Sequence, residues 1–168
     1  METSMEQTFL RIYDEFANRV FRHCYFRVSN REKAKDITQE TFKRIWEYFS
    51  SSGVMLQNEK AFVFRIANNL IIDSYRKKKE DSLDVLQEAG FDIGFDERES
   101  IMNMISHQEI IKLLDELDPK YKDAIVMRYI DDMSVKDMAS VAGVSENVIS
   151  VRIHRGLLKI KDIIKSHA

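Results

Sequence analysis

One segment near the C-terminus combines side chains that can read the edges of DNA bases. Arginine pairs with guanine or phosphate, asparagine pairs with adenine, and an exposed valine can contact the methyl group of thymine. On a helix that begins after Ser145, the four-residue repeat of Ile149, Ile153 and Leu157 would face a core. The outward side would then carry Asn147, Ser150, Val151, His154 and Arg155, with Arg152 at its margin. This pattern predicts a helix that enters the major groove.

The residues before this helix predict the shorter half of a helix-turn-helix. Ser134 and Asp137 are spaced as in a capping box, and Gly143 can end the short helix in the left-handed conformation. Asp118 and Pro119 predict an earlier helix start, with aspartate as N-cap and proline at the first helical position. A helical hairpin used for protein contact has the same outline. Two capped helices with a glycine between them favour DNA binding over that alternative.

The N-terminal part predicts three amphipathic helices with a shared apolar face. The first covers about residues 9–25 and is interrupted at Ser29 and Asn30, the second ends at 50–53, and the third covers about 58–79. Adjacent asparagines are poor choices inside an apolar helix, so Asn68, Asn69 or both are expected to have a function. The last turn of the third helix carries four bases suited to phosphate contacts, Arg76, Lys77, Lys78 and Lys79.

The composition favours an all-α protein, because 168 residues contain one proline and five glycines. Its net charge of −2 hides a segregation: residues 51–79 carry +4, residues 80–107 carry −7 and residues 134–168 carry +3. A charge run can be simply a solvated face, but this alternation suggests two lobes that bind nucleic acid, joined by an acidic connector. The sequence pI of about 6.1 argues against a general DNA-coating protein.

Other classes of protein lack support in the sequence. The single Cys24 excludes a disulfide framework, and no Cys/His cluster has metal-ligand spacing, so no metal or cofactor is expected. The first residues do not form a signal peptide, and no apolar run approaches the roughly 18 residues of a membrane span. We therefore expect a soluble, cytoplasmic protein without membrane insertion or a small-molecule substrate.

Three stretches, in order and at matching spacing, resemble the extracytoplasmic-function (ECF, group 4) sigma factors of bacterial RNA polymerase. Residues 36–46, DITQETFKRIW, resemble region 2.2 of that family. Residues 62–73, FVFRIANNLIID, resemble regions 2.3–2.4, and residues 118–158 resemble region 4 with its helix-turn-helix. The resemblance to this branch of the sigma-70 family covers nearly the whole chain.

The resemblance implies a noncatalytic subunit that binds core polymerase, recognises the minus-ten and minus-thirty-five promoter elements and promotes DNA melting in transcription initiation. It implies a sigma-2-like helical bundle over residues 1–79, an acidic linker over 80–106 and a sigma-4-like helix-turn-helix domain over 107–168. The implied partners are promoter DNA, the β′ clamp helices and β flap of the polymerase, and an anti-sigma factor as a further candidate. One polar face is implied to dock on the clamp helices: Asp36, Gln39, Glu40, Lys43 and Arg44.

The resemblance also assigns roles to the DNA-binding candidates. Asn69 matches the asparagine that reads the non-template strand of the minus-ten element, beside a loop at about 53–60 that holds a flipped base. Asn68 and the four bases at 76–79 are placed with it. The implied minus-thirty-five set is Asn147, Val148, Ser150, Val151, Arg152, His154 and Arg155. Three departures from the family pattern prevent the transfer of a promoter preference, and they are Val148, Ser150 and Gly156. Phe62 and Asn68 depart from the family pattern in the region that is implied to separate the DNA strands.

Two other functions compete with this interpretation. A stand-alone helix-turn-helix regulator would use residues 1–79 as a ligand or dimer domain, but it would not explain the region 2 motifs. A nucleic-acid hydrolase would need metal ligands, and the paired carboxylates are limited to Asp131, Asp132 and scattered acids of the linker. His154 has no nucleophile or carboxylate beside it in the sequence pattern, so we expect it to contact DNA. Trp46 is either a core ring or part of the implied polymerase-binding surface, and we expect the core ring.

Overall fold

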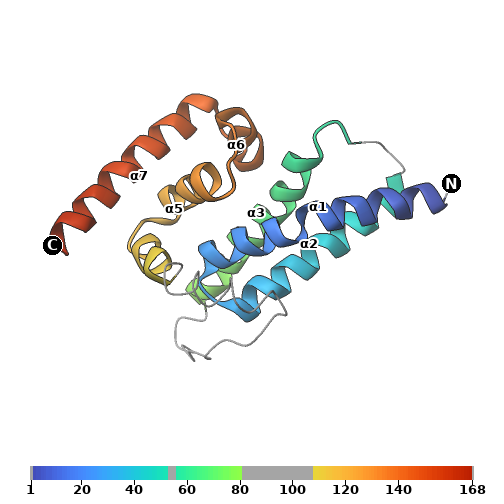
Figure 1. The fold of residues 1–168 in the computed structure, drawn as a ribbon, viewed down its shortest axis with the longest axis horizontal. Helices are drawn as coiled ribbons and strands as arrows, with labels where there is room; N and C mark the ends of the chain where they lie inside the picture. Colours follow the sequence, from blue (N-terminus) through green and yellow to red (C-terminus); the bar gives the residue numbers. More distant parts are fainter. Residues whose placement is uncertain (1, 53–55, 81–107, 168) are drawn as a thin grey trace.

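The computed structural model describes residues 2–52, 56–80 and 108–167, and the regular structure in these ranges is helical (Figure 1). The first three helices are α1 (Glu2–Val28), α2 (Arg31–Ser52) and α3 (Glu59–Glu80). After a helical stretch at 108–115 follow α5 (Pro119–Ile125), the π-helix η1 (Val126–Ile130), α6 (Val135–Ala142) and α7 (Glu146–Ser166). The all-α prediction is confirmed. The predicted acidic linker lies outside the described residues apart from Glu80.

Helices α1, α2 and α3 form the N-terminal lobe, a three-helix bundle with the predicted shared apolar face. Ile12, Ile45 and Phe64, one from each helix, are fully buried in its centre. Between α1 and α2 the chain reverses at Ser29, which adopts a left-handed φ of 57°. The side chain of Asn30 then accepts a hydrogen bond from the Lys33 N–H (3.0 Å) and so caps the first turn of α2.

Residues 108–167 form the C-terminal lobe, in which the predicted helix-turn-helix is present. Ser134 Oγ accepts from the Asp137 N–H (3.0 Å), and Ser145 Oγ accepts from the Val148 N–H (3.2 Å). Gly143 between them has a φ of 70°, a conformation that costs a glycine little. Asp118 occupies the N-cap position of α5, but its side chain makes no capping bond. Its carboxylate instead pairs with Lys159 Nζ of α7 at 3.4 Å.

The core side of α7 differs from the prediction at one position. Ile149 is buried and Ile153 packs against the core, but Leu157 is 41% exposed. The next core position is Gly156, because steps of four and then three residues follow the 3.6-residue turn better than two steps of four. A Cβ atom on Gly156 would lie 3.0 Å from Ile125 Cγ1, so the glycine allows α7 to approach α5 closely.

A π-helical turn ends the α5 segment and directs the following residues toward the N-terminal lobe. The Asp131 N–H donates to the Val126 carbonyl and the Met133 N–H donates to the Met127 carbonyl, each at 3.0 Å. This widened turn brings Asp131 and Met133 into buried positions. Asp132 between them is exposed and has a left-handed φ of 53°.

The two lobes pack directly against one another. Helix α3 contacts α6, and α1 contacts η1. Met127, Met133 and Met138 of the C-terminal lobe belong to the same buried cluster as the core of the N-terminal lobe. Phe26 of α1 in turn packs into the cluster of the C-terminal lobe around Leu114 and Tyr121. The described residues therefore share a continuous apolar interior across the lobe boundary.

Candidate nucleic-acid interface

The predicted minus-ten residues lie on different sides of α3. Asn69 is exposed, whereas Asn68 is only 3% exposed. Adjacent residues on an α-helix point about 100° apart, which explains the difference. Arg76 and Lys77 are exposed near the end of α3. Lys78 and Lys79 lie in the same helix, and the structure describes only their backbone.

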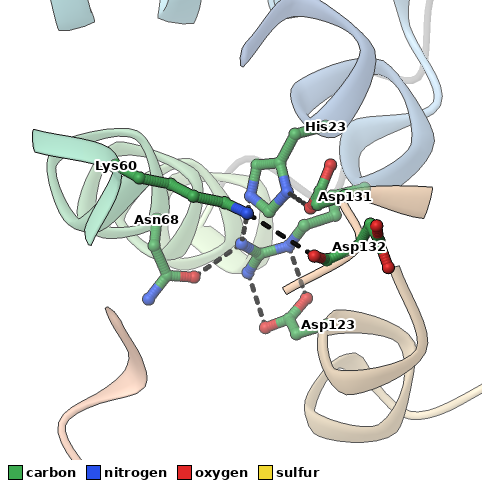
Figure 2. Close-up of polar contacts among 7 residues, drawn as sticks. His23, Lys60, Asn68, Asp123, Asp131 and Asp132 are labelled. Atoms are coloured by element: carbon green, nitrogen blue, oxygen red, sulfur yellow. Dashed lines mark hydrogen bonds and ion pairs between the residues drawn. The ribbon is translucent and has the colours of Figure 1, made fainter. Parts of the chain in front are cut away.

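Asn68 is part of a buried polar cluster centred on Arg27 of α1. Arg27 Nη1 donates to Asn68 Oδ1 at 2.5 Å, and Nε donates to Asp123 Oδ1 of α5 at 2.6 Å (Figure 2). Nη2 of the same guanidinium ion-pairs with Asp123 Oδ2 at 2.5 Å. Burial disfavours the charged form of Arg27, but the Asp123 carboxylate and Tyr75 outweigh burial, and the pKa of Arg27 is raised. Arg27 is therefore a buried cation whose carboxylate partner comes from the other lobe.

His23 and Asp131 extend this cluster. His23 Nδ1 hydrogen-bonds to Asp131 Oδ2, and both side chains are fully buried (Figure 2). The other ring nitrogen, Nε2, lies 3.1 Å from Arg27 Nη1. A guanidinium only donates, so Nε2 accepts and the proton of the neutral ring resides on Nδ1, directed at Asp131. We call His23, Arg27, Asn68, Asp123 and Asp131 the interlobe cluster.

Tyr75 covers the interlobe cluster from α3. Its hydroxyl donates to the Arg27 carbonyl at 3.0 Å, and the Arg27 guanidinium lies 6.0 Å from the centre of its ring. Burial raises the pKa of Tyr75 to about 12, which keeps the hydroxyl protonated as a donor. Beside Tyr75, a groove of about 330 Å³ lies between the second half of α3 and the C-terminal lobe. Its lining includes Ile72 of α3 and Lys120, Met127 and Arg152 of the C-terminal lobe.

The predicted recognition residues form an exposed strip on the first half of α7. The exposed members are Asn147, Val148, Ser150, Val151, His154 and Arg155. Arg152 is half-buried, in agreement with its predicted place at the margin. Because the Ser145 cap and Ile149 fix the start of the helix, the strip begins at its N-terminal turn. Such a strip has the geometry of a helix that reads base edges.

The predicted polymerase-binding residues share one outer face of α2. Asp36, Gln39, Lys43 and Arg44 are exposed, and Glu40 is half-buried. Arg44 Nε ion-pairs with Glu40 Oε1 at 3.1 Å along this face.

The expectation of a core position for Trp46 is wrong, because its side chain is 39% exposed. Ile45 fills the core at this level, and the adjacent Trp46 is turned away from it. The indole instead packs edge-on against Phe9, with 5.2 Å between the ring centres, and adds an aromatic surface to α2.

The sequence interpretation did not identify the interlobe cluster. A signal was present, because His23 and Arg27 continue the buried stripe of α1 after Val20 at helical spacing. A histidine and an arginine at such positions need buried polar partners. Those partners, Asp123 and Asp131, lie about one hundred residues away, beyond the reach of local patterns.

Other kinds of site find no support in the described parts of the chain. Within residues 2–52, 56–80 and 108–167, no group of three or more His, Cys, Asp or Glu side chains could hold a metal ion. None of the helices in those ranges is long and apolar enough to cross a bilayer.

Comparisons with known proteins give a family match for each of the two lobes. Residues 12–81 match the family model "Sigma-70 region 2", and residues 107–160 match "Sigma-70, region 4". The chain is 28% identical over 163 residues to the ECF RNA polymerase sigma factor SigW of Bacillus subtilis, covering 90% of this chain and 86% of SigW. It is 26% identical over 163 residues to the ECF sigma factor BldN of Streptomyces coelicolor, covering 95% of this chain and 61% of BldN.

Two solved structures have a similar fold. CnrH, in complex with the cytosolic domain of CnrY, superposes with a TM-score of 0.74 and 19% identity, over 97% of this chain and 91% of CnrH. The sigma factor RpoE, in complex with the anti-sigma factor NepR from Bartonella quintana, superposes with a TM-score of 0.72 and 22% identity, over 96% of this chain and 97% of RpoE.

Proposed function

Because the chain belongs to the ECF sigma factors of the sigma-70 family, we propose a separate surface of the chain for each promoter element and for the polymerase. A sigma factor of this family serves RNA polymerase in recognising promoters. We assign the minus-ten element to a domain over residues 1–79 and the minus-thirty-five element to a domain over residues 107–168. The chain itself contributes binding and not catalysis.

The proposed contact with the minus-thirty-five element rests on the exposed strip on α7. Arg155, Asn147 and Val151 are exposed and differ in the chemistry that they offer to base edges. We propose that Arg152, half-buried at the edge of the strip, contacts phosphate or a guanine edge. The helix that holds them is fixed by a cap and a buried isoleucine, so the backbone of the strip needs little ordering on binding.

For the minus-ten element, we assign base reading to Asn69. It is exposed on the same helix as Arg76 and Lys77, which can hold the DNA backbone. Lys78 and Lys79 extend this basic end in the sequence. Asn68 is engaged with Arg27, so we regard it as a residue that positions Arg27, and a DNA contact by Asn68 stays a prediction.

The outer face of α2 is the proposed contact with the β′ clamp helices. Its mixed charges suit a polar protein–protein interface, and the exposed ring of Trp46 adds an apolar anchor beside it. The β flap of the polymerase stays a further proposed contact, and no surface of the chain is assigned to it. An anti-sigma factor is a further proposed partner, because RpoE was solved with the anti-sigma factor NepR, CnrH was solved with the cytosolic domain of CnrY, and the groove beside Tyr75 is open to a partner.

Run-off transcription tests the assignment. Purified bacterial core polymerase would be incubated with fragmented DNA from the source organism, with and without this protein. We expect new discrete transcripts that depend on the protein, and mapping their starts would define the promoter elements. Absence of transcripts together with absence of co-migration with core polymerase would contradict the proposal.

Variants of the α2 face test whether this surface contacts core polymerase. Lys43→Glu combined with Arg44→Glu should abolish co-migration with core polymerase, because both side chains are exposed and belong to the proposed contact. The matched control, Lys161→Glu combined with Lys165→Glu, reverses two exposed cations at the far end of α7. We expect the control to keep core binding. Equal loss in both variants would show that net charge, and not this face, determines binding.

A further inference from the structure

We propose that Val151 makes the exposed strip on α7 selective for thymine, by packing against the C5 methyl group of a thymine in the minus-thirty-five element. The inference rests on the proposed function and deepens it, because it names the base that one side chain of the strip selects. The promoters of this protein would then share a thymine at a fixed position within that element.

Val151 lies on the side of α7 that points furthest from the core. Ile149 is 2% exposed and marks the core side of the helix. At about 100° per residue, Val151 and Asn147 each lie about 160° from Ile149 around the helix axis, and His154 follows at about 140°. Asn147, Val151 and His154 are all exposed, and we call them the outer line of the strip. When a recognition helix lies in the major groove, its outermost side chains face the base edges.

The cations of the strip lie on one flank of the outer line. Arg155 lies about 120° and Arg152 about 60° from Ile149, both in the same rotational sense. The opposite flank carries Glu146 and Ser150, which are exposed. Phosphates line the edges of the groove, so the arginine flank suits contacts at one edge and the outer line is left for the bases in the middle.

The side chain of Val151 offers a base only apolar contact. Its exposed fraction is 39%, so part of its apolar surface is in water before DNA binds. In the major groove every base edge presents hydrogen-bonding groups, and thymine alone adds a methyl group. Against the polar groups of another base, the valine would exclude water and supply no partner, which costs free energy. Against a thymine methyl group, both partners lose apolar surface to water, and the contact is favourable.

The first test removes single methyl groups from the DNA. It uses the holoenzyme of this protein with core polymerase, on a promoter mapped by run-off transcription. Each thymine of the minus-thirty-five element, on either strand, is replaced in turn by uracil, which lacks the C5 methyl group and keeps the hydrogen-bonding groups of thymine. We expect one replacement to weaken holoenzyme binding about fourfold, the effect of losing one buried methyl group. Gel-shift titration measures binding at one fixed salt concentration, because phosphate contacts make the affinity depend on salt.

The second test assigns the lost contact to Val151. In Val151→Ala, the ratio of the affinities for the thymine and uracil promoters should fall from about four to about one, because the contact is already absent. The variant should fold, since Val151 is exposed and alanine favours helices more than valine does. The matched control is Ile164→Ala, which shortens a β-branched side chain that is 56% exposed on the same helix, outside the strip. We expect the control to keep the fourfold ratio.

Three results would overturn the proposal. They are mapped promoters without a thymine in the minus-thirty-five element, a wild-type holoenzyme that binds every uracil promoter as tightly as the original, and the same uracil effect in Val151→Ala as in the wild type. In each case transcription from the mapped promoters would persist, and the proposed function would stand. Absence of any transcript that depends on the protein would instead contradict the proposed function, and this inference with it.

Discussion

Arg27 of α1 donates a hydrogen bond to Asn68 of α3, with 2.5 Å between Nη1 and Oδ1, while the next residue, Asn69, is exposed. Two adjacent asparagines of the same helix are therefore in different environments. Asn68 accepts a hydrogen bond from the buried guanidinium of Arg27, and the side chain of Asn69 is exposed to solvent. This relationship gives Asn68 a structural role and leaves Asn69 accessible for the proposed DNA contact.

The first prediction compares alanine variants at these two positions. Asn68→Ala should lower the free energy of unfolding by about 1–3 kcal/mol, because it leaves a buried guanidinium N–H without its acceptor. Asn69→Ala should change stability by less than about 0.5 kcal/mol. It should nevertheless reduce transcription from promoters with an intact minus-ten element. Urea unfolding and run-off transcription on the same preparations measure both effects, and the reverse pattern would refute the assignment.

The second prediction concerns the recognition strip. Arg152→Ala combined with Arg155→Ala should remove the dependence of transcription on the minus-thirty-five element. Each arginine that pairs with a guanine edge contributes about 1–3 kcal/mol of discrimination. Core binding should persist, because neither residue lies on α2. Lys161→Ala is the control, since Lys161 is exposed on the same helix outside the strip. Loss of core binding in the double variant would show that the polymerase interface is misplaced.

The third prediction uses the close approach of α7 and α5. Gly156→Val should lower the free energy of unfolding by about 1–3 kcal/mol, because its added carbons meet Ile125 and Tyr121. Gly156→Ala is the milder comparison, since a gain in helix propensity of up to about 1 kcal/mol offsets the tight 3.0 Å contact. Thermal and urea unfolding compare the two variants. Equal stability of Gly156→Val and the wild type would show that the contact between the helices is loose.

The fourth prediction concerns acid stability. Arg11 Nη1 and Nη2 donate to the two carboxylate oxygens of Glu59 at 3.0 and 2.5 Å, and these bonds hold the pKa of Glu59 below its usual 4.5. A carboxylate with a lowered folded-state pKa stabilises the protein above its unfolded pKa, and the contribution is lost as the pH falls through the folded value. As the pH is lowered below about 4.5, the free energy of unfolding of Glu59→Gln should therefore fall less than that of the wild type.

Urea unfolding between pH 7 and pH 3 measures this effect. Glu47→Gln is the control, because Glu47 is exposed on α2. We expect the control to follow the wild-type profile. An identical profile for Glu59→Gln would show that the ion pair does not contribute in solution, as is common for exposed pairs.

Local features of the fold could be predicted from the sequence. The caps at Ser134 and Ser145 and the turn at Gly143 depend on residues within a few positions, and all three are present. The outward orientation of Asn147 and Arg155 follows from helical periodicity and is also confirmed. The predictions for Trp46 and Leu157 were wrong, and both side chains are partly exposed. At each position, a shift of one residue along the helix changes whether the side chain faces the core or the solvent.

The contact between the lobes could not be predicted in this way. The hydrogen bond between His23 and Asp131 joins residues 108 positions apart, and no periodicity links them. In the sequence, Asp131 and Asp132 stand out only as a pair of neighbouring carboxylates. Their roles depend on how two independently recognisable lobes dock, which is a property of tertiary packing.

The π-turn at Val126–Ile130 makes the mutual orientation of the lobes sensitive to the length of the chain. Each residue advances an α-helix by about 100°, and the widened turn accommodates one residue more than an α-turn. Deletion of one residue there would restore α-helical spacing and rotate the backbone that carries Asp131 and Met133 away from α1. Each lobe would keep its own helices, but the present contacts between the two lobes would be lost. The length of this turn thus determines which residues of the C-terminal lobe face α1.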